Sequence, residues 1–252
     1  MDGSNVKALR KAWLLIFASN GLVVSAFTDK PFDPGQATVS IAELQHPLSG
    51  KAKSMLLKAQ AALQAGKFPE CLQDLDQAMK IPSAIPYVYG IRGAAYLASG
   101  EVAKALPELQ QAVQVLPVPG NYSNLGYAYF LSGDRDLGEE QVRRAIESPN
   151  APLQARFLMG LLLLDRKSET DEACDDLDRA RDLMPSVHMA LAVCYARDGM
   201  EDASNSEIRQ LLGTTRASMF EFWKRWVTSV AAEPDPAVAF GLRPHSEPTA
   251  HR

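Results

Sequence analysis

The sequence predicts an all-α fold in which pairs of helices repeat along the chain. Three observations support this prediction. Small residues recur in expected helices every 32 to 34 positions, turn glycines recur with the same period, and prolines close the successive units. A period of this size is typical of proteins built from stacked repeats, in which each repeat buries its apolar face against the next.

The small residues mark expected crossings between helices. The stretch NYSNLGYAYFLSGD, residues 121–134, places Gly126 in the middle of an expected helix. Glycine there costs about 0.5–1 kcal/mol relative to alanine, so close helix packing must compensate. We expect an alanine on the following helix to face it. The small slot recurs at Ala59, Gly93, Gly126, Gly160 and Ala192, and the alanine slot at Ala78, Ala112, Ala145 and Ala180.

Turns and helix ends follow the same period. Glycine permits the left-handed backbone of a tight turn, and proline stops a helix because it cannot extend the hydrogen-bond ladder. In the second unit these signals predict helices over residues 87–99 and 102–116. The fourth unit carries one extra residue around positions 166–169. The turn glycines are Gly66, Gly100, Gly133 and Gly199, and the closing prolines are Pro82, Pro117, Pro149 and Pro185.

This pattern resembles the tetratricopeptide repeat (TPR). The second unit matches it with Tyr89, Gly93, Tyr96, Gly100, Ala105, Leu109, Ala112 and Pro117, and the third with Tyr122, Leu125, Gly126, Tyr129, Gly133, Gly138, Val142, Ala145 and Pro149. The first unit places Cys71 in an alanine slot, and the fifth keeps little beyond Leu191, Ala192, Tyr195 and Gly199. The resemblance spans about 160 residues and implies an α-solenoid of about five helix-turn-helix units that binds another protein.

The N-terminal segment predicts an exported protein. Residues 1–26 have a positive start, an apolar stretch over residues 12–24, and small residues before a cleavage site after Ala26, as in a signal peptide. Cleavage leaves no stable membrane span and places the protein in the periplasm or outside the cell. A membrane anchor and a cytosolic helix remain open alternatives. The other expected regions are an extended leader (27–48), the repeat array (49–213), a capping helix (214–232) and a disordered tail (233–252).

The expected capping helix carries an aromatic stripe. Its members recur at spacings of three and four, as on one face of a helix, and they are Phe220, Trp223, Trp226, Val227 and Val230. A terminal repeat needs a cover because no further repeat follows it, so we interpret the helix as a cap. An aromatic docking site is the alternative. Upstream, the alternating segment 38–48 is expected to lie extended across the first helix.

The resemblance implies a concave binding wall formed by the first helix of each unit. The Lys and Asn side chains with which some TPR proteins clamp a terminal carboxylate are replaced here by Leu56, Gln60, Gly90 and Ala94, and Asn124 alone matches. We therefore expect an apolar peptide or helix as the partner. Occupation of the wall by the aromatic helix, the tail or segment 38–48 stays open. The expected groove residues are Tyr87, Leu97, Ser123, Tyr127, Phe130, Leu131, Phe157, Leu161 and Leu164.

Little in the sequence indicates other chemistry. Adjacent antiparallel helices are expected to bring Cys174 near Cys194, so these two are candidates for a disulfide; otherwise both are small buried residues. Cys71 is expected to be inert. The acidic run over residues 171–182 is expected to be a solvated helix face.

The remaining features concern the function class. No catalytic, phosphate-binding or metal motif occurs, so we expect no enzyme activity, cofactor or metal. The net charge of −4 argues against nucleic acid as a partner. We expect an exported scaffold in cell-envelope assembly or trafficking. The alternatives are a holdase-like carrier of hydrophobic peptides and an enzyme or non-catalytic subunit of an enzyme complex. The partner and the oligomeric state are left open.

Overall fold

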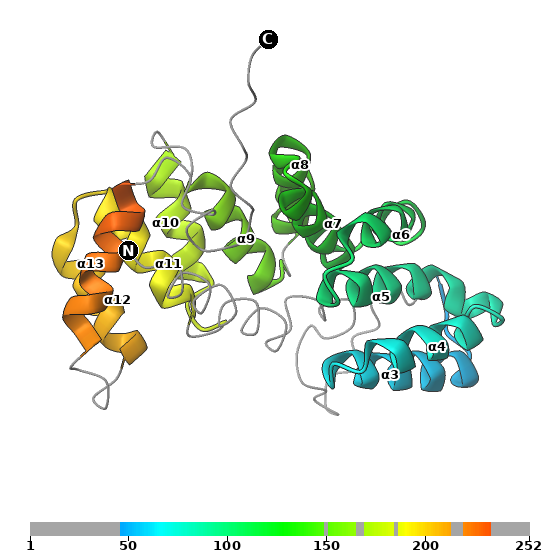
Figure 1. Ribbon diagram of the computed structural model, residues 1–252. Helices are drawn as coiled ribbons and strands as arrows, with labels where there is room; N and C mark the ends of the chain where they lie inside the picture. The colour runs from blue at the N-terminus through cyan, green and yellow to red at the C-terminus, as the bar shows by residue number, and fades with distance from the viewer. Residues whose placement is uncertain (1–45, 149–150, 165–168, 184–185, 213–218, 233–252) are drawn as a thin grey trace, which may run out of the picture. The chain divides into compact units, whose positions relative to one another are not determined.

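The computed structural model describes residues 46–148, 151–164, 169–183, 186–212 and 219–232 (Figure 1). Over these ranges the chain forms helices and no strands, which confirms the predicted all-α class. The expected signal peptide, the disordered tail, almost all of the leader and most of the insertion around 166–169 lie outside the described residues. The described residues fall into two compact units, one ending at Ala155 and one beginning at Arg156.

The first unit consists of three helix pairs. In each pair the two helices contact each other extensively, and successive pairs also pack together. Helix α5 contacts both α3 and α7, so the first helices of successive repeats lie side by side. The pairs are α3 (Gly50–Gln64) with α4 (Phe68–Ala78), α5 (Ile85–Ala98) with α6 (Val102–Val115), and α7 (Pro119–Ser132) with α8 (Arg135–Ile146); the short 3₁₀ helix η1 (Pro82–Ala84) precedes α5.

The second unit continues the pattern and ends in a further helix. The helix α13 packs against both α11 and α12. It buries Trp226, Val227 and Val230, three members of the predicted aromatic stripe, as expected of a cap. The unit comprises α9 (Leu153–Leu163, which begins at the boundary), α10 (Thr170–Arg179), α11 (Ser186–Arg197), α12 (Glu201–Leu212) and α13 (Phe220–Ala232). Among the helices that the structure describes, none combines the length and apolar character that a membrane span requires.

The predicted turn glycines end the first helices of four repeats. Gly66, Gly100, Gly133 and Gly199 have φ values of 70°, 81°, 92° and 75°, a region that favours glycine. After each glycine, the next residue donates its N–H to a carbonyl five positions earlier, which satisfies an otherwise open group at the helix end. These bonds are Lys67 to Ala62 (2.9 Å), Glu101 to Tyr96 (2.8 Å), Asp134 to Tyr129 (2.9 Å) and Met200 to Tyr195 (2.8 Å).

The helix crossings are as close as predicted, but the facing residue is different. A Cβ atom at Gly93 would stand 2.5 Å from Leu109, and one at Gly160 would stand 2.5 Å from Leu177. The expected partners Ala112 and Ala180 are buried but lie three residues further along the second helix. Antiparallel helices joined by a short turn place residues equally far from the turn at one level, and these alanines lie about one turn beyond it.

Candidate functional site

The structure buries most of the predicted groove residues. Five of them, Ser123, Phe130, Phe157, Leu161 and Leu164, expose at most 4% of their surface. Tyr87 and Leu97 are similarly buried, with 4% and 5% exposure. The expectation that these seven side chains line an open apolar wall is therefore corrected. In the first unit, α3, α5 and α7 each pack against their own second helix and against neighbouring elements, so much of their surface belongs to the core.

Two half-buried groove residues remain, and both lie on α7. They are Tyr127 and Leu131. The Tyr127 and Phe130 rings stack with their centroids 6.5 Å apart and their planes at 20°. Burial raises the pKa of the Tyr127 hydroxyl well above its ordinary value, so this side chain stays neutral.

Two buried asparagines precede Tyr127 on the same helix. Asn121 and Asn124 lie one turn apart and expose 1% and 3% of their surface. The Asn121 Nδ2 atom donates to Leu116 O at 2.8 Å, which satisfies a carbonyl at the end of α6. Asn121 Oδ1 and Asn124 Nδ2 are buried without a hydrogen-bond partner among the described residues. An unsatisfied buried polar group costs about 1–3 kcal/mol, so each calls for an explanation.

The carboxamide of Asn121 lies directly against the backbone of α5. A Cβ atom added to Gly90 would stand 2.5 Å from Asn121 Oδ1. A side chain at position 90 would therefore require the Asn121 carboxamide to move away from its present position. From the sequence, the resemblance assigned Gly90 to the concave wall, where it departs from the carboxylate clamp, and Asn121 was overlooked. The sequence did offer one signal for Asn121, because it places a carboxamide within the mostly apolar stretch 119–132.

We call Asn121, Asn124, Tyr127 and Leu131 the α7 face, because they recur at spacings of three and four along one helix. Its polar end supplies one hydrogen-bond donor and one acceptor. Its other end supplies partly exposed aromatic and aliphatic surface. A peptide main chain offers the complementary carbonyl and N–H groups on every residue, so this combination suits a peptide more than a small charged ligand.

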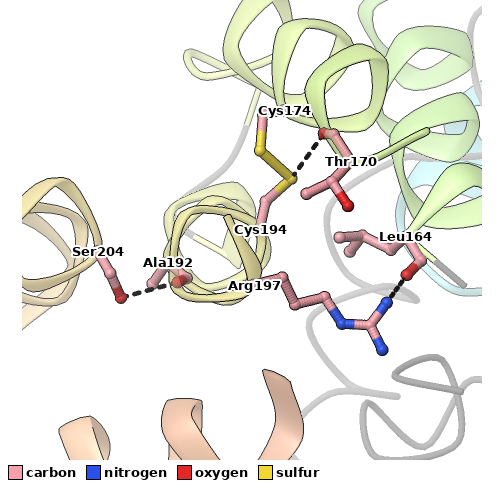
Figure 2. The surroundings of a disulfide bond; sticks show 7 residues. All are labelled: Leu164, Thr170, Cys174, Ala192, Cys194, Arg197 and Ser204. Atoms are coloured by element: carbon pink, nitrogen blue, oxygen red, sulfur yellow. Dashed lines mark hydrogen bonds between the residues drawn. A yellow bond between two sulfur atoms is a disulfide. The ribbon is translucent and has the colours of Figure 1, made fainter. Parts of the chain in front are cut away.

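The second unit contains a disulfide between α10 and α11 (Figure 2). It joins Cys174 and Cys194, whose Cα atoms lie 5.7 Å apart, within the range that disulfides require. Cys71, in the other unit, is free and buried. Burial raises the pKa of the Cys71 thiol from 9.0 to about 11, with a smaller contribution from Asp74. A thiol that stays protonated is a poor nucleophile.

An open cavity of about 540 Å³ lies near the disulfide, between α11, α12 and α13. No motif in the sequence predicted it. Its basic side chains already contact acceptors: Arg197 Nε donates to Ala231 O at 3.0 Å, Arg197 Nη1 donates to Leu164 O (Figure 2), and Lys224 Nζ lies 2.7 Å from Glu201. With its basic groups engaged in this way, the cavity is a weaker candidate for ligand binding than the α7 face.

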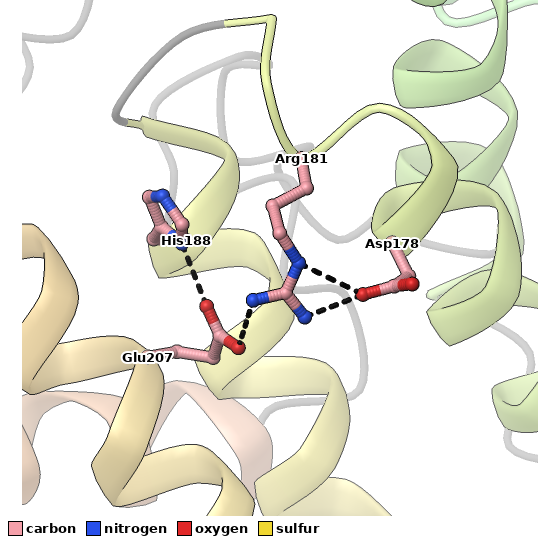
Figure 3. Close-up of polar contacts among 4 residues, drawn as sticks. All are labelled: Asp178, Arg181, His188 and Glu207. Atoms are coloured by element: carbon pink, nitrogen blue, oxygen red, sulfur yellow. Dashed lines mark hydrogen bonds and ion pairs between the residues drawn. The ribbon is translucent and has the colours of Figure 1, made fainter.

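A charged network ties the end of α10 to α11 and α12 (Figure 3). The buried Glu207 carboxylate lies 2.7 Å from both Arg181 Nη1 and His188 Nδ1. Asp178 also pairs with Arg181, and together with Glu207 it raises the pKa of that guanidinium. The network spans elements distant in sequence, and its position at a helix junction indicates a structural role.

The acidic run on α10 is exposed except at one position. Asp171, Glu172, Asp175 and Asp178 are exposed as expected. Asp176 departs from the expectation of a solvated face, because it is 5% exposed and its Oδ1 lies 3.0 Å from Arg156 Nη1. Within the described ranges, no group of three or more His, Cys, Asp or Glu side chains is arranged to hold a metal ion.

Comparison with known proteins gives structural likeness alone. No family model and no curated protein sequence matches the chain. The fold is similar to that of TTC0263, a thermophilic TPR protein of Thermus thermophilus (TM-score 0.53, 19% identity, covering 71% of this chain and 97% of that one). It is also similar to YrrB, described as a TPR protein with an unusual peptide-binding site (0.52, 16%, 69% and 92%), and to MamA (0.50, 16%, 69% and 96%).

These likenesses agree with the repeat spacing, the four left-handed turn glycines and the close helix crossings described above. The described part of the chain has the tetratricopeptide-repeat fold.

Proposed function

We propose that this protein is an exported interaction scaffold that binds an apolar peptide or helix of a partner protein along the α7 face. The observation that carries the proposal is the Asn124 Nδ2 group, which is buried on a first helix of the repeat and lacks an acceptor among the described residues. The TPR fold supports a role in protein binding, and the peptide-binding site described for YrrB gives a precedent within that fold.

The chemistry of the face fits a main-chain ligand. Asn124 Nδ2 is the donor for a peptide carbonyl, and the half-buried Tyr127 and Leu131 supply apolar contact beside it. Hydrogen bonds to a peptide main chain provide affinity for many sequences, while contacts to side chains select among them. Because the Asn124 amide is buried, the ligand must displace whatever covers it before the hydrogen bond forms.

The proposed export rests on two features. The Cys174–Cys194 disulfide suits an oxidising compartment, because thiols in the cytosol are normally kept reduced. The pattern of residues 1–26 suits a signal peptide. Mass spectrometry of protein from its own cells tests this part. A mature N-terminus at Phe27 with one free thiol is expected, and an intact Met1 with three free thiols contradicts export.

Binding is tested by selecting peptides on the immobilised protein and measuring their affinity for two variants. Asn124→Ala removes the donor, and we expect it to weaken binding about tenfold, equivalent to about 1.4 kcal/mol. Asn205→Ala is the control, because this half-buried asparagine lies on α12 in the other unit. Equal affinities for wild type and Asn124→Ala contradict the proposal. Binding of unfolded chains without sequence preference indicates the holdase-like alternative instead.

A further inference from the structure

The open cavity of the second unit has the dimensions of a site for a small ligand. It lies where α11 ends and α12 begins, beside the last turns of α13. Its volume of about 540 Å³ falls within the range of about 300–1,000 Å³ that small-molecule sites occupy. The cavity and the α7 face belong to different units, so a ligand bound here is separate from the peptide proposed above.

Hydrogen bonds hold the three helices together around the cavity. Arg197 Nε on α11 donates to Ala231 O on α13 at 3.0 Å. Ser204 Oγ on α12 donates to Ala192 O on α11 at 2.8 Å (Figure 2). The apolar face of α13 is also buried against α11 and α12. The cavity is therefore preformed, and a ligand can enter without rearrangement of the helices.

Two opposite charges line the cavity side by side. Lys224 Nζ lies 2.7 Å from Glu201 Oε1, and the two side chains are 35% and 72% exposed. The hydrogen bond between them raises the pKa of Lys224 and lowers the pKa of Glu201, so both are charged at neutral pH. An ammonium group donates up to three hydrogen bonds, and a carboxylate accepts at both oxygens. The pair can therefore bind a further negative group at Lys224 and a further positive group at Glu201.

The lining also includes small residues that leave space for an apolar group. They come from the ends of α11 and α13, and none has a side chain larger than a methyl group: Ala196, Gly199, Ala231 and Ala232. A ligand that fits this lining has two opposite charges close together and an apolar part of moderate size.

We propose that the cavity binds a free α-amino acid with an apolar side chain. Its carboxylate pairs with Lys224 and its ammonium group pairs with Glu201, so four charges of alternating sign lie next to one another. Both charges of an amino acid are attached to one carbon atom, which matches a protein pair whose charged atoms are 2.7 Å apart. A peptide carries its terminal charges on different residues and holds them further apart.

Equilibrium dialysis of the full chain against radiolabelled leucine tests the proposal, with unlabelled analogues as competitors. Leucinamide lacks the carboxylate, and N-acetylleucine lacks the ammonium group, but both keep the same side chain. We expect unlabelled leucine to compete at least about tenfold more strongly than either analogue, because each analogue loses one hydrogen bond between charged groups. Glycine, which has both charges and no side chain, should also compete more weakly than leucine.

Substitutions test whether leucine binds in this cavity. Lys224→Gln and Glu201→Gln each remove one charge from an exposed side chain, and each should weaken leucine binding about tenfold. Lys67→Gln is the matched control, because Lys67 forms an exposed ion pair with Glu70 in the other unit, and it should leave binding unchanged. Circular dichroism checks that all three variants are folded.

Three results would overturn the proposal. The first is the absence of bound leucine at millimolar concentration. The second is equal competition by leucine and both analogues, which indicates contact with apolar surface alone. The third is undiminished binding in both Lys224→Gln and Glu201→Gln, which places leucine elsewhere on the protein.

Discussion

Gly126 on α7 lies so close to Val142 on α8 that a Cβ atom added to the glycine would stand 2.5 Å from Val142 Cγ2. The same atom would stand 2.9 Å from the backbone oxygen of Gly138. Rotation of a side chain cannot relieve a contact with backbone. The crossing therefore depends on the absence of a side chain at position 126, and this explains a glycine in the middle of a helix.

Replacing this glycine should destabilise the first unit. Gly126→Leu forces the two helices apart, and we expect the free energy of unfolding to fall by roughly 2–3 kcal/mol. Urea denaturation followed by circular dichroism measures the change. The control is Gly50→Leu, because a Cβ atom at Gly50 meets nothing within 4 Å. A change below about 0.5 kcal/mol for Gly126→Leu, typical of a surface substitution, is incompatible with the close crossing.

The disulfide should stabilise the second unit. Cys174 and Cys194 are separated by 20 residues, and the chain-entropy model assigns a loop of this size about 3 kcal/mol. Replacing both with serine should lower the free energy of unfolding by that amount. Reducing agent should have the same effect on the wild-type protein and none on the double variant. An unfolding midpoint that does not respond to reducing agent rules out a contribution from this bond.

The free thiol of Cys71 should make stability depend on pH in alkaline solution. Burial raises its pKa from 9.0 to about 11 in the folded protein, so the folded state holds the proton more tightly than the unfolded state. Its contribution to stability is complete below pH 9 and is lost as the pH rises toward 11. Cys71→Ala should flatten this part of the profile relative to wild type. Parallel profiles of the two proteins between about pH 8 and 11 would show that the thiol titrates normally.

The carboxylate of Glu207 should matter more than that of Glu201. Glu207 is 3% exposed and pairs with Arg181 and His188, so Glu207→Gln should cost about 1–3 kcal/mol of folding free energy. Glu201→Gln is the matched control on the same helix, because its side chain is 72% exposed and its ion pair with Lys224 is screened by solvent; we expect a much smaller loss. Thermal denaturation at neutral pH compares them, and equal losses would show that the network contributes nothing specific.

The repeat architecture could be predicted from sequence because it depends on local chemistry. Glycine at positions 66, 100, 133 and 199 is required by the backbone of each turn, so its spacing revealed the repeat period and the ends of the first helices. In the second repeat, the predicted ranges 87–99 and 102–116 agree with α5 and α6 to within two residues.

The binding wall was harder to predict because exposure depends on every neighbouring element. Phe157 and Leu161 occupy positions that the resemblance assigns to a concave surface, yet both are buried in this chain. The prediction that Ala145 faces Gly126 was wrong for a similar reason. In the three-dimensional packing, Val142 is the residue level with Gly126. Asn121 carries no signal in the repeat pattern, and its role depends on the position of Gly90 and of the end of α6.

The structure of the protein bound to a selected peptide tests the central claim most directly. The proposal predicts the peptide along α5 and α7, with one of its main-chain oxygens accepting a hydrogen bond of about 2.9 Å from Asn124 Nδ2. A peptide bound elsewhere, such as at the exposed Met219 and Phe222 around the start of α13, with Asn124 unchanged, would contradict the α7 face as the binding site.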